Sequence, residues 1–182
     1  KLVEINDRAL KFKLISRENY SVNKSIALYE ISKIKKDGNL DEAIILMEKA
    51  LKLREYFAPY ISYYIQLLIE NKKLSKANKY IYKAWQHSAH PNYYNEIRAL
   101  SIKLKIPVID FISKIISNTK DSYESKILLA SSLIENQDWL LAKDCLTSLL
   151  EHKPSREVCI LMSKIEEGDT NDPQKVNAWV TR

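Results

Sequence analysis

Glycine is almost absent from this chain, and long apolar runs are missing altogether. Only two glycines occur in 182 residues, so the glycine-rich loops that cradle phosphates in nucleotide-binding enzymes have no counterpart here. No segment alternates apolar and polar residues as a half-buried strand does. No apolar run reaches the roughly 18 residues of a membrane-spanning helix. The scarcity of glycine and the lack of strand alternation predict an all-helical chain.

Catalytic motifs are missing as well. The sequence contains no G-x-G-x-x-G, H-E-x-x-H or G-x-S-x-G pattern. We therefore expect a protein that is not an enzyme and that holds no resident cofactor or metal. Its two cysteines, Cys145 and Cys159, lie on apolar helical stripes. Buried free thiols are the expected state there, and a disulfide or a redox role is the alternative.

One pair of histidines keeps a ligand role open. His87 and His90 stand in the segment W-Q-H-S-A-H-P, and either ring could hold haem or a metal ion. The chain is expected to leave its helix between them, however, and no third ligand lies nearby in the sequence. His152 and Met162 are weaker candidates for the same role.

A repeat of 34 residues is the main pattern that the sequence does contain. The same residue types return one period apart: Leu40, Ala43 and Ala50 in one segment, and Leu74, Ala77 and Ala84 in the next. This period is typical of the tetratricopeptide repeat (TPR), a helix–turn–helix unit. Small side chains suit the places where its second helix approaches neighbouring first helices. Gly38-Asn39 suits the turn between the two helices, because glycine readily adopts a positive φ.

Matching residues continue downstream at Leu129, Ala130, Ala142 and Pro154. The predicted units are 24–57, 58–91, 92–121, 122–154 and 155–182, preceded by a helix over 3–17. The predicted fold is all-α: a right-handed α–α superhelix of four to five helical hairpins, some of them degenerate, in one solenoid domain over 1–182. Arrays of this kind present extended binding surfaces, so the pattern favours a protein-binding scaffold.

Tyrosine is common, with eleven in the chain. The first helices of a TPR array line its concave face, where rigid aromatic side chains make good contacts for a peptide or a helix. We expect the partner-binding residues at Tyr29, Tyr60, Tyr63, Gln66 and Tyr93. Three tyrosines fall within five residues at 60–64, so some of these rings must belong to the core instead.

Charge is unevenly distributed along the chain. Residues 1–120 carry 22 Lys and Arg against 12 Asp and Glu, a net charge of +10, whereas residues 121–182 carry 7 against 11, a net charge of −4. The basic part is either a solvated outer face or a surface attracted to anionic membranes. Nucleic-acid binding is a third option, disfavoured because no RNA-binding signature accompanies the lysines.

Several residues match those of a known protein family in the same order along the chain. They are Pro59, Leu67, Leu68, Trp85, His90 and Pro91, then Asp138, Trp139 and Ala142, then Arg156, Glu166, Glu167, Gly168, Asp169 and Trp179. Their order and spacing resemble the C-terminal region of HemY-type TPR proteins of the bacterial inner membrane, in the form found in alphaproteobacteria. The resemblance implies a soluble TPR domain, two preceding membrane helices and an association with late haem biosynthesis.

The expected function is therefore that of a non-catalytic scaffold for protein partners, such as haem-pathway or membrane proteins. A haem or porphyrin carrier is one alternative, and an adaptor that binds membranes or nucleic acid through its basic half is another. Because the chain starts with Lys1 and not Met, we expect it to be part of a longer protein whose membrane anchor lies outside it. The expected location is the inner membrane, with this domain on the cytoplasmic side.

Overall fold

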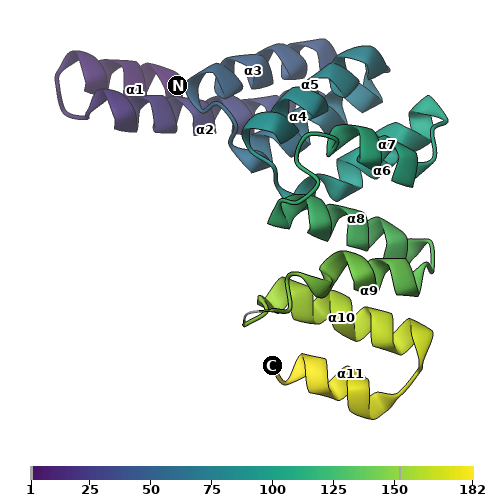
Figure 1. The fold of residues 1–182 in the computed structure, drawn as a ribbon. Helices are drawn as coiled ribbons and strands as arrows, with labels where there is room; N and C mark the ends of the chain where they lie inside the picture. The colour runs from purple at the N-terminus through teal and green to yellow at the C-terminus, as the bar shows by residue number, and fades with distance from the viewer. Residues whose placement is uncertain (1, 152) are drawn as a thin grey trace. The chain divides into compact units, whose positions relative to one another are not determined.

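The computed structural model describes residues 2–151 and 153–182. These residues form eleven α-helices, one 3₁₀ turn and no strand (Figure 1). The helices are α1 (Leu2–Lys11), α2 (Arg17–Lys36), α3 (Leu40–Leu53), α4 (Ala58–Glu70), α5 (Leu74–His87), α6 (Tyr94–Leu104), α7 (Val108–Ile115), α8 (Tyr123–Glu135), α9 (Trp139–Thr147), α10 (Arg156–Asp169) and α11 (Pro173–Val180), with the 3₁₀ turn η1 at Pro91–Tyr93. The predicted all-α class is confirmed.

The chain divides into two compact units, Lys1–Ser88 and Ala89–Arg182. Within each unit, helices that follow one another in the sequence pack side by side as antiparallel hairpins (Figure 1). The sequence predicted one continuous domain with right-handed superhelical winding; the winding stays a prediction. Within the described residues, no helix combines the length and the apolar content that a membrane crossing requires.

Alanines hold the hairpins of the first unit close together. Ala43, Ala50, Ala77 and Ala84 are all at most 1% exposed, because each lies where α3 or α5 meets a neighbouring helix. The buried Ser32 hydroxyl on α2 donates a 2.9 Å hydrogen bond to the backbone carbonyl of Ala43 on α3. A larger side chain at position 43 would force these two helices apart.

The start of the first unit differs from its prediction. A single helix was expected over 3–17 and the first repeat from residue 24, whereas α1 ends at Lys11 and α2 already begins at Arg17. The side chain of Ser16 accepts a hydrogen bond from the backbone N–H of Asn19, which caps α2 and sets its first residue. The first helix of the first repeat is therefore 20 residues long.

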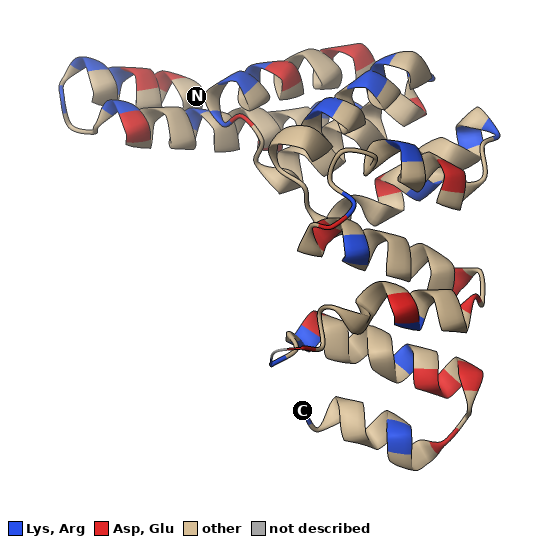
Figure 2. Cartoon of the chain, viewed as in Figure 1, with Lys and Arg blue, Asp and Glu red and all other residues tan. Residues whose placement is uncertain are grey.

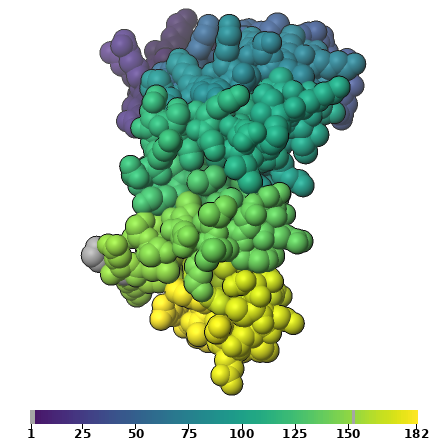
Figure 3. All heavy atoms as spheres, turned by 45° about the vertical axis from the view of Figure 1, so that its right-hand side comes forward, coloured from purple at the N-terminus to yellow at the C-terminus, as the bar shows by residue number. Residues whose placement is uncertain are grey.

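The second unit is built around α8, α9 and α10. Its core includes Ile127, Ala130, Leu133, Ala142, Leu146, Val158, Leu161, Met162 and Ile165. Ala130 and Ala142 are fully buried, whereas Leu129 and Pro154, predicted as packing positions of the same kind, are only half-buried. In the space-filling view, the green and yellow segments that contain these helices lie directly against one another (Figure 3).

The turns between paired helices do not use glycine as predicted. Neither glycine has a positive φ, whereas Lys72 and Gln137, at the equivalent turn position in later repeats, have φ of 56° and 63°. After α2, the backbone N–H of Asn39 bonds the carbonyl of Lys35 at 2.8 Å, four residues back. That bonding continues the helical pattern through Gly38, so this turn needs no left-handed residue.

Gly168 matters for a different reason, namely the close approach of an aromatic ring. It lies in the last turn of α10, and a methyl group added to its Cα would overlap the indole ring of Trp139 on α9. By contrast, nothing lies within 4 Å of the position that a Cβ would take at Gly38. The two glycines of the chain therefore form a matched pair for testing this contact.

We predict that Gly168→Ala lowers the free energy of unfolding by about 1–3 kcal/mol, the usual cost of overpacking a tight contact. Gly38→Ala should leave it unchanged or raise it by up to about 1 kcal/mol, since it only restricts the unfolded chain. Urea unfolding followed by circular dichroism measures both. Equal stability of the two variants would show that Trp139 does not pack against Gly168.

Candidate functional site

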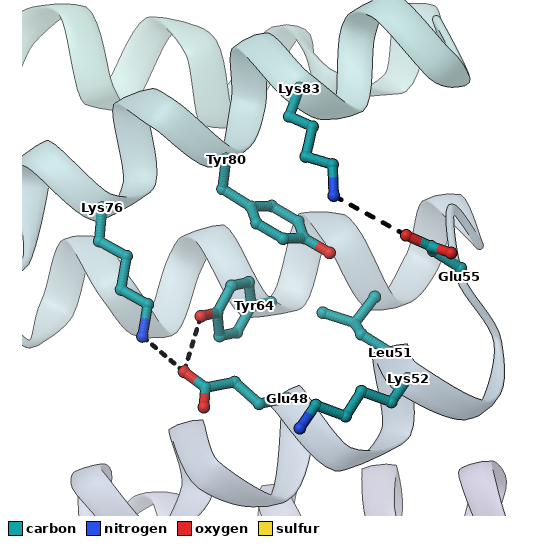
Figure 4. Close-up of a pocket in the computed structure, with 8 residues that line it drawn as sticks. All are labelled: Glu48, Leu51, Lys52, Glu55, Tyr64, Lys76, Tyr80 and Lys83. Carbon is teal, nitrogen blue, oxygen red and sulfur yellow. Dashed lines mark hydrogen bonds and ion pairs between the residues drawn. The ribbon is translucent and has the colours of Figure 1, made fainter.

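A groove of about 450 Å³ opens between α3 and α5 in the first unit (Figure 4). We call it the α3–α5 groove. It is lined by Glu48, Leu51 and Lys52 of α3, Glu55 just beyond that helix, Tyr64 of α4, and Lys76, Tyr80 and Lys83 of α5. The lining residues of α5 follow one another at intervals of four and three, so they share one face of the helix.

Two tyrosines form the centre of the α3–α5 groove. Tyr64 is buried, and its ring meets the ring of Tyr80 edge to face, with centroids 4.9 Å apart and an interplanar angle of 74°. The Tyr64 hydroxyl donates a 2.9 Å hydrogen bond to Oε1 of Glu48. Burial raises the pKa of Tyr64 well above its usual value and raises the pKa of Tyr80 to about 12. Both hydroxyls therefore stay protonated near neutral pH.

Ion pairs join the two walls of the groove. Lys76 lies 2.6 Å from Glu48, and Lys83 lies 3.9 Å from Glu55 (Figure 4). Burial acts to raise the pKa of Glu48, but hydrogen bonds from Lys76 and Tyr64 outweigh it and hold the pKa below its usual value. Glu48 is therefore a carboxylate at neutral pH, fixed between an ammonium group and a phenol.

This arrangement is suited to binding. An apolar and aromatic floor lies inside a charged rim, which is the layout of a protein-interface pocket. Among the residues that the structure describes, no three His, Cys, Asp or Glu side chains lie close enough to hold a metal ion. The groove therefore offers contacts for side chains, and its charges other than Lys52 are already paired to each other.

The predicted partner-binding face on the first helices is only partly accessible. Tyr60 and Tyr93 are buried, 2% and 0% exposed, so they are core residues and cannot contact a partner. Tyr60 stacks on Tyr29 at 4.9 Å, and Tyr63 meets Tyr29 edge to face at 5.3 Å, because α2 and α4 pack against each other through these rings. Tyr29 and Tyr63 are half-buried and Gln66 is exposed.

The two histidines proposed as ligands already contact the protein. The ring of His87 stacks on Tyr56 with centroids 4.7 Å apart, and its Nδ1 donates to the carbonyl of Lys83 at 2.8 Å. Nδ1 of His90 accepts from the backbone N–H of Asn92 at 3.2 Å. His87 and His90 belong to different units. His152 lies outside the described residues, and Met162 is buried in the core.

Seven of the lysines that the structure describes in the first unit pair with carboxylates, and six do not: Lys11, Lys13, Lys49, Lys52, Lys72 and Lys79. Lys36 of α2 contacts Glu70 of α4 at 2.7 Å, and Lys35 contacts Glu42 of α3 at 3.2 Å. Figure 2 accordingly shows blue and red segments interspersed over α2 and α3, whereas α5 carries no acidic residue and shows blue segments only. A mixed surface attracts an extended polyanion less than a purely basic one does. The unpaired lysines keep the membrane and nucleic-acid alternatives open.

We predict that Glu48→Gln destabilises the first unit at neutral pH but not in acid. A lowered pKa means that the carboxylate stabilises the folded state above the usual pKa of glutamate, and that this contribution is lost as pH falls through the folded-state value. Since the Glu48 side chain is 36% exposed, the loss should stay below about 1 kcal/mol. Urea unfolding at pH 7 and pH 3 measures it.

Glu167→Gln, which removes the same charge from an exposed position of α10, is the control and should show no such loss at pH 7. A pH-independent difference between Glu48→Gln and the unmodified chain would contradict the role given to the carboxylate.

Comparison with models of protein families finds no match, and comparison with curated proteins finds none either. Among solved structures, PilF of Pseudomonas aeruginosa is similar, with 13% identity, a TM-score of 0.43 and coverage of 98% of this chain and 86% of its own. YrrB, described as a TPR protein with an unusual peptide-binding site, is 13% identical, with a TM-score of 0.42 and coverage of 86% and 85%. Neither likeness carries a ligand or a partner over to this chain, and its resemblance to HemY-type proteins stays a prediction.

Proposed function

We propose that this chain is a non-catalytic scaffold that binds a segment of a partner protein in the α3–α5 groove. The observation that supports this most directly is the pair of rings at its centre, Tyr64 and Tyr80, inside a rim of lysines and glutamates. Aromatic anchors surrounded by a polar rim are where protein interfaces concentrate their binding energy.

The floor of the groove is held in place before a partner arrives. Tyr64 is fixed by its hydrogen bond to Glu48 and by contact with Tyr80, and Glu48 is fixed in turn by Lys76. A preorganised surface loses little side-chain entropy on binding, so more of the contact energy is retained as affinity.

The size of the groove indicates what can enter it. A volume of about 450 Å³ accommodates a few side chains and is within the usual range for binding pockets. It is too small for a folded domain. We therefore propose that the partner inserts a short segment, with an aromatic or aliphatic side chain against Leu51 and Tyr80 and polar groups along the ion pairs of the rim.

A finer proposal rests on the family resemblance. We propose that the partner belongs to haem biosynthesis or to the inner membrane, and that an anchor outside this chain holds the protein there with this domain on the cytoplasmic side. The residues between Pro59 and Pro91 that match HemY-type proteins in order and spacing support this resemblance. The free thiols of Cys145 and Cys159 suit a reducing compartment.

Capture by the purified chain of individually purified haem-pathway and inner-membrane proteins tests this function. We predict that Tyr80→Ala weakens any partner's binding about tenfold or more, because it removes half of the aromatic floor. Tyr80→Phe, which keeps the ring, should bind within about threefold of the unmodified chain. Gln66→Ala, on the first-helix face, should leave binding unchanged.

The opposite pattern would contradict the proposal. If Gln66→Ala abolishes binding of a captured partner while Tyr80→Ala does not, the first-helix face is the binding surface and the α3–α5 groove is not. Circular dichroism melting of each variant separates loss of contact from loss of fold.

A further inference from the structure

A second groove, of about 470 Å³, lies in the other unit between α10 and α11. We call it the α10–α11 groove. Its lining combines three cations, Lys153, Arg156 and Arg182, with the apolar side chains of Ile160, Trp179 and Val180, and it includes no acidic residue. It is therefore unlike the α3–α5 groove, whose lining includes Glu48 and Glu55 beside its lysines.

The three cations meet at one end of this hairpin. Lys153 and Arg156 flank the start of α10, and Arg182 follows the end of α11. Since the two helices are antiparallel (Figure 1), the start of one lies beside the end of the other. Within residues 2–151 and 153–182, none of the three forms an ion pair with a carboxylate. The positive end of the α10 helix dipole adds to their potential.

An apolar wall accompanies these charges. Ile160 is 45% exposed and Val180 is 69% exposed, so considerable aliphatic surface faces solvent beside the cations. The guanidinium of Arg182 lies 4.5 Å from the centroid of the Trp179 ring, a cation–π contact that orients it along the groove.

Acidic residues gather at the opposite end of the same hairpin. Glu166, Glu167 and Asp169 stand in the last turns of α10, and Asp172 precedes α11, which Figure 2 shows as red segments at that end. The hairpin is thus polarised, with the unpaired cations at one end and most carboxylates at the other. Glu157, in the first turn of α10, is the exception; it accepts a 3.3 Å hydrogen bond from the Tyr123 hydroxyl and does not line the groove.

We propose that the α10–α11 groove binds an acidic peptide segment that carries at least one aliphatic or aromatic side chain. Carboxylates of the peptide pair with Lys153, Arg156 and Arg182, and its apolar side chain packs against Ile160, Trp179 and Val180. This site lies in a different unit from the α3–α5 groove, so either site can fail without the other.

A peptide fits the observations better than an extended polyanion does. A nucleic acid or an anionic membrane would also meet the carboxylates at the far end of the hairpin, in a segment, 121–182, whose net charge is −4. Repulsion between like charges opposes that approach, and the exposed Ile160 and Val180 offer nothing to a phosphate backbone. A short peptide contacts only the basic end.

The test uses the 182-residue chain and a fluorescein-labelled synthetic peptide of alternating glutamate and leucine, followed by fluorescence anisotropy. We predict saturable binding that weakens with added salt, and weaker binding of a peptide with glutamine in place of glutamate. Arg156→Glu should raise the dissociation constant about tenfold or more. Lys164→Glu makes the same charge change on α10 outside the groove and should alter it less than about threefold.

Four outcomes would overturn the proposal. The first is the absence of saturable peptide binding, and the second is an equal loss of peptide affinity in Arg156→Glu and Lys164→Glu. The third is tighter binding of anionic vesicles or single-stranded DNA than of the peptide, abolished by Arg156→Glu. The fourth is a dimer, seen by sedimentation, that Arg156→Glu dissociates. The third would assign the groove to a polyanion, and the fourth to a second copy of this chain. Ile160→Ser, an uncharged change in the apolar wall, should also weaken the peptide and separates its apolar contact from charge alone.

Discussion

The structure of the first unit depends on the close approach of neighbouring helices at four alanines. Ala43, Ala50, Ala77 and Ala84 leave almost no surface to solvent, and a larger side chain there would overpack the contacts of α3 and α5 with the helices beside them. Because α3 and α5 both pack closely on α4, their exposed faces lie near each other. The α3–α5 groove, with Tyr64 below and Tyr80 on one wall, exists because of that spacing.

The same spacing places charges from neighbouring repeats within reach of each other. Lys76 and Lys83 on α5 are each 28 residues after the glutamate they contact, and Lys36 is 34 residues before Glu70. A sequence that carries a large excess of lysine therefore folds into a surface of mixed charge in its first unit. A further group of unpaired cations lies where the net charge gave no indication of it, at one end of α10 and α11 in the acidic C-terminal part.

Period and residue size were enough to predict helical pairs and the buried alanines, but not the helix bounds at the start of the chain or the half-buried Leu129 and Pro154. The interval of 34 residues predicted helical pairs, and the alanines that carry it are buried as that packing requires. The interval could not separate core tyrosines from exposed ones. Tyr60 and Tyr63 both lie on the first helix of a repeat and both contact Tyr29 of α2, yet the fold buries Tyr60 and leaves Tyr63 half-buried.

The sequence alone could not predict the turn conformations or the groove residues either, because both depend on contacts that form only in the folded chain. Gly38 suggested a left-handed turn, yet Lys72 and Gln137 adopt that conformation at the corresponding positions, since bonding to the helix end, and not residue preference, decides it. Lys76 and Glu48 look like ordinary surface residues until the fold brings them to 2.6 Å. Their spacing of nearly one repeat is the one signal that could have identified the pair.

Hydrogen exchange of the backbone amides, measured with and without a captured partner, tests the central claim most directly. We predict slower exchange in α3 and α5 when the partner is bound, with little change in α2, because a segment seated between Glu48 and Lys83 shields both groove walls. Protection confined to α2 and the exposed face of α4 would contradict the claim and would place the binding surface on the first helices.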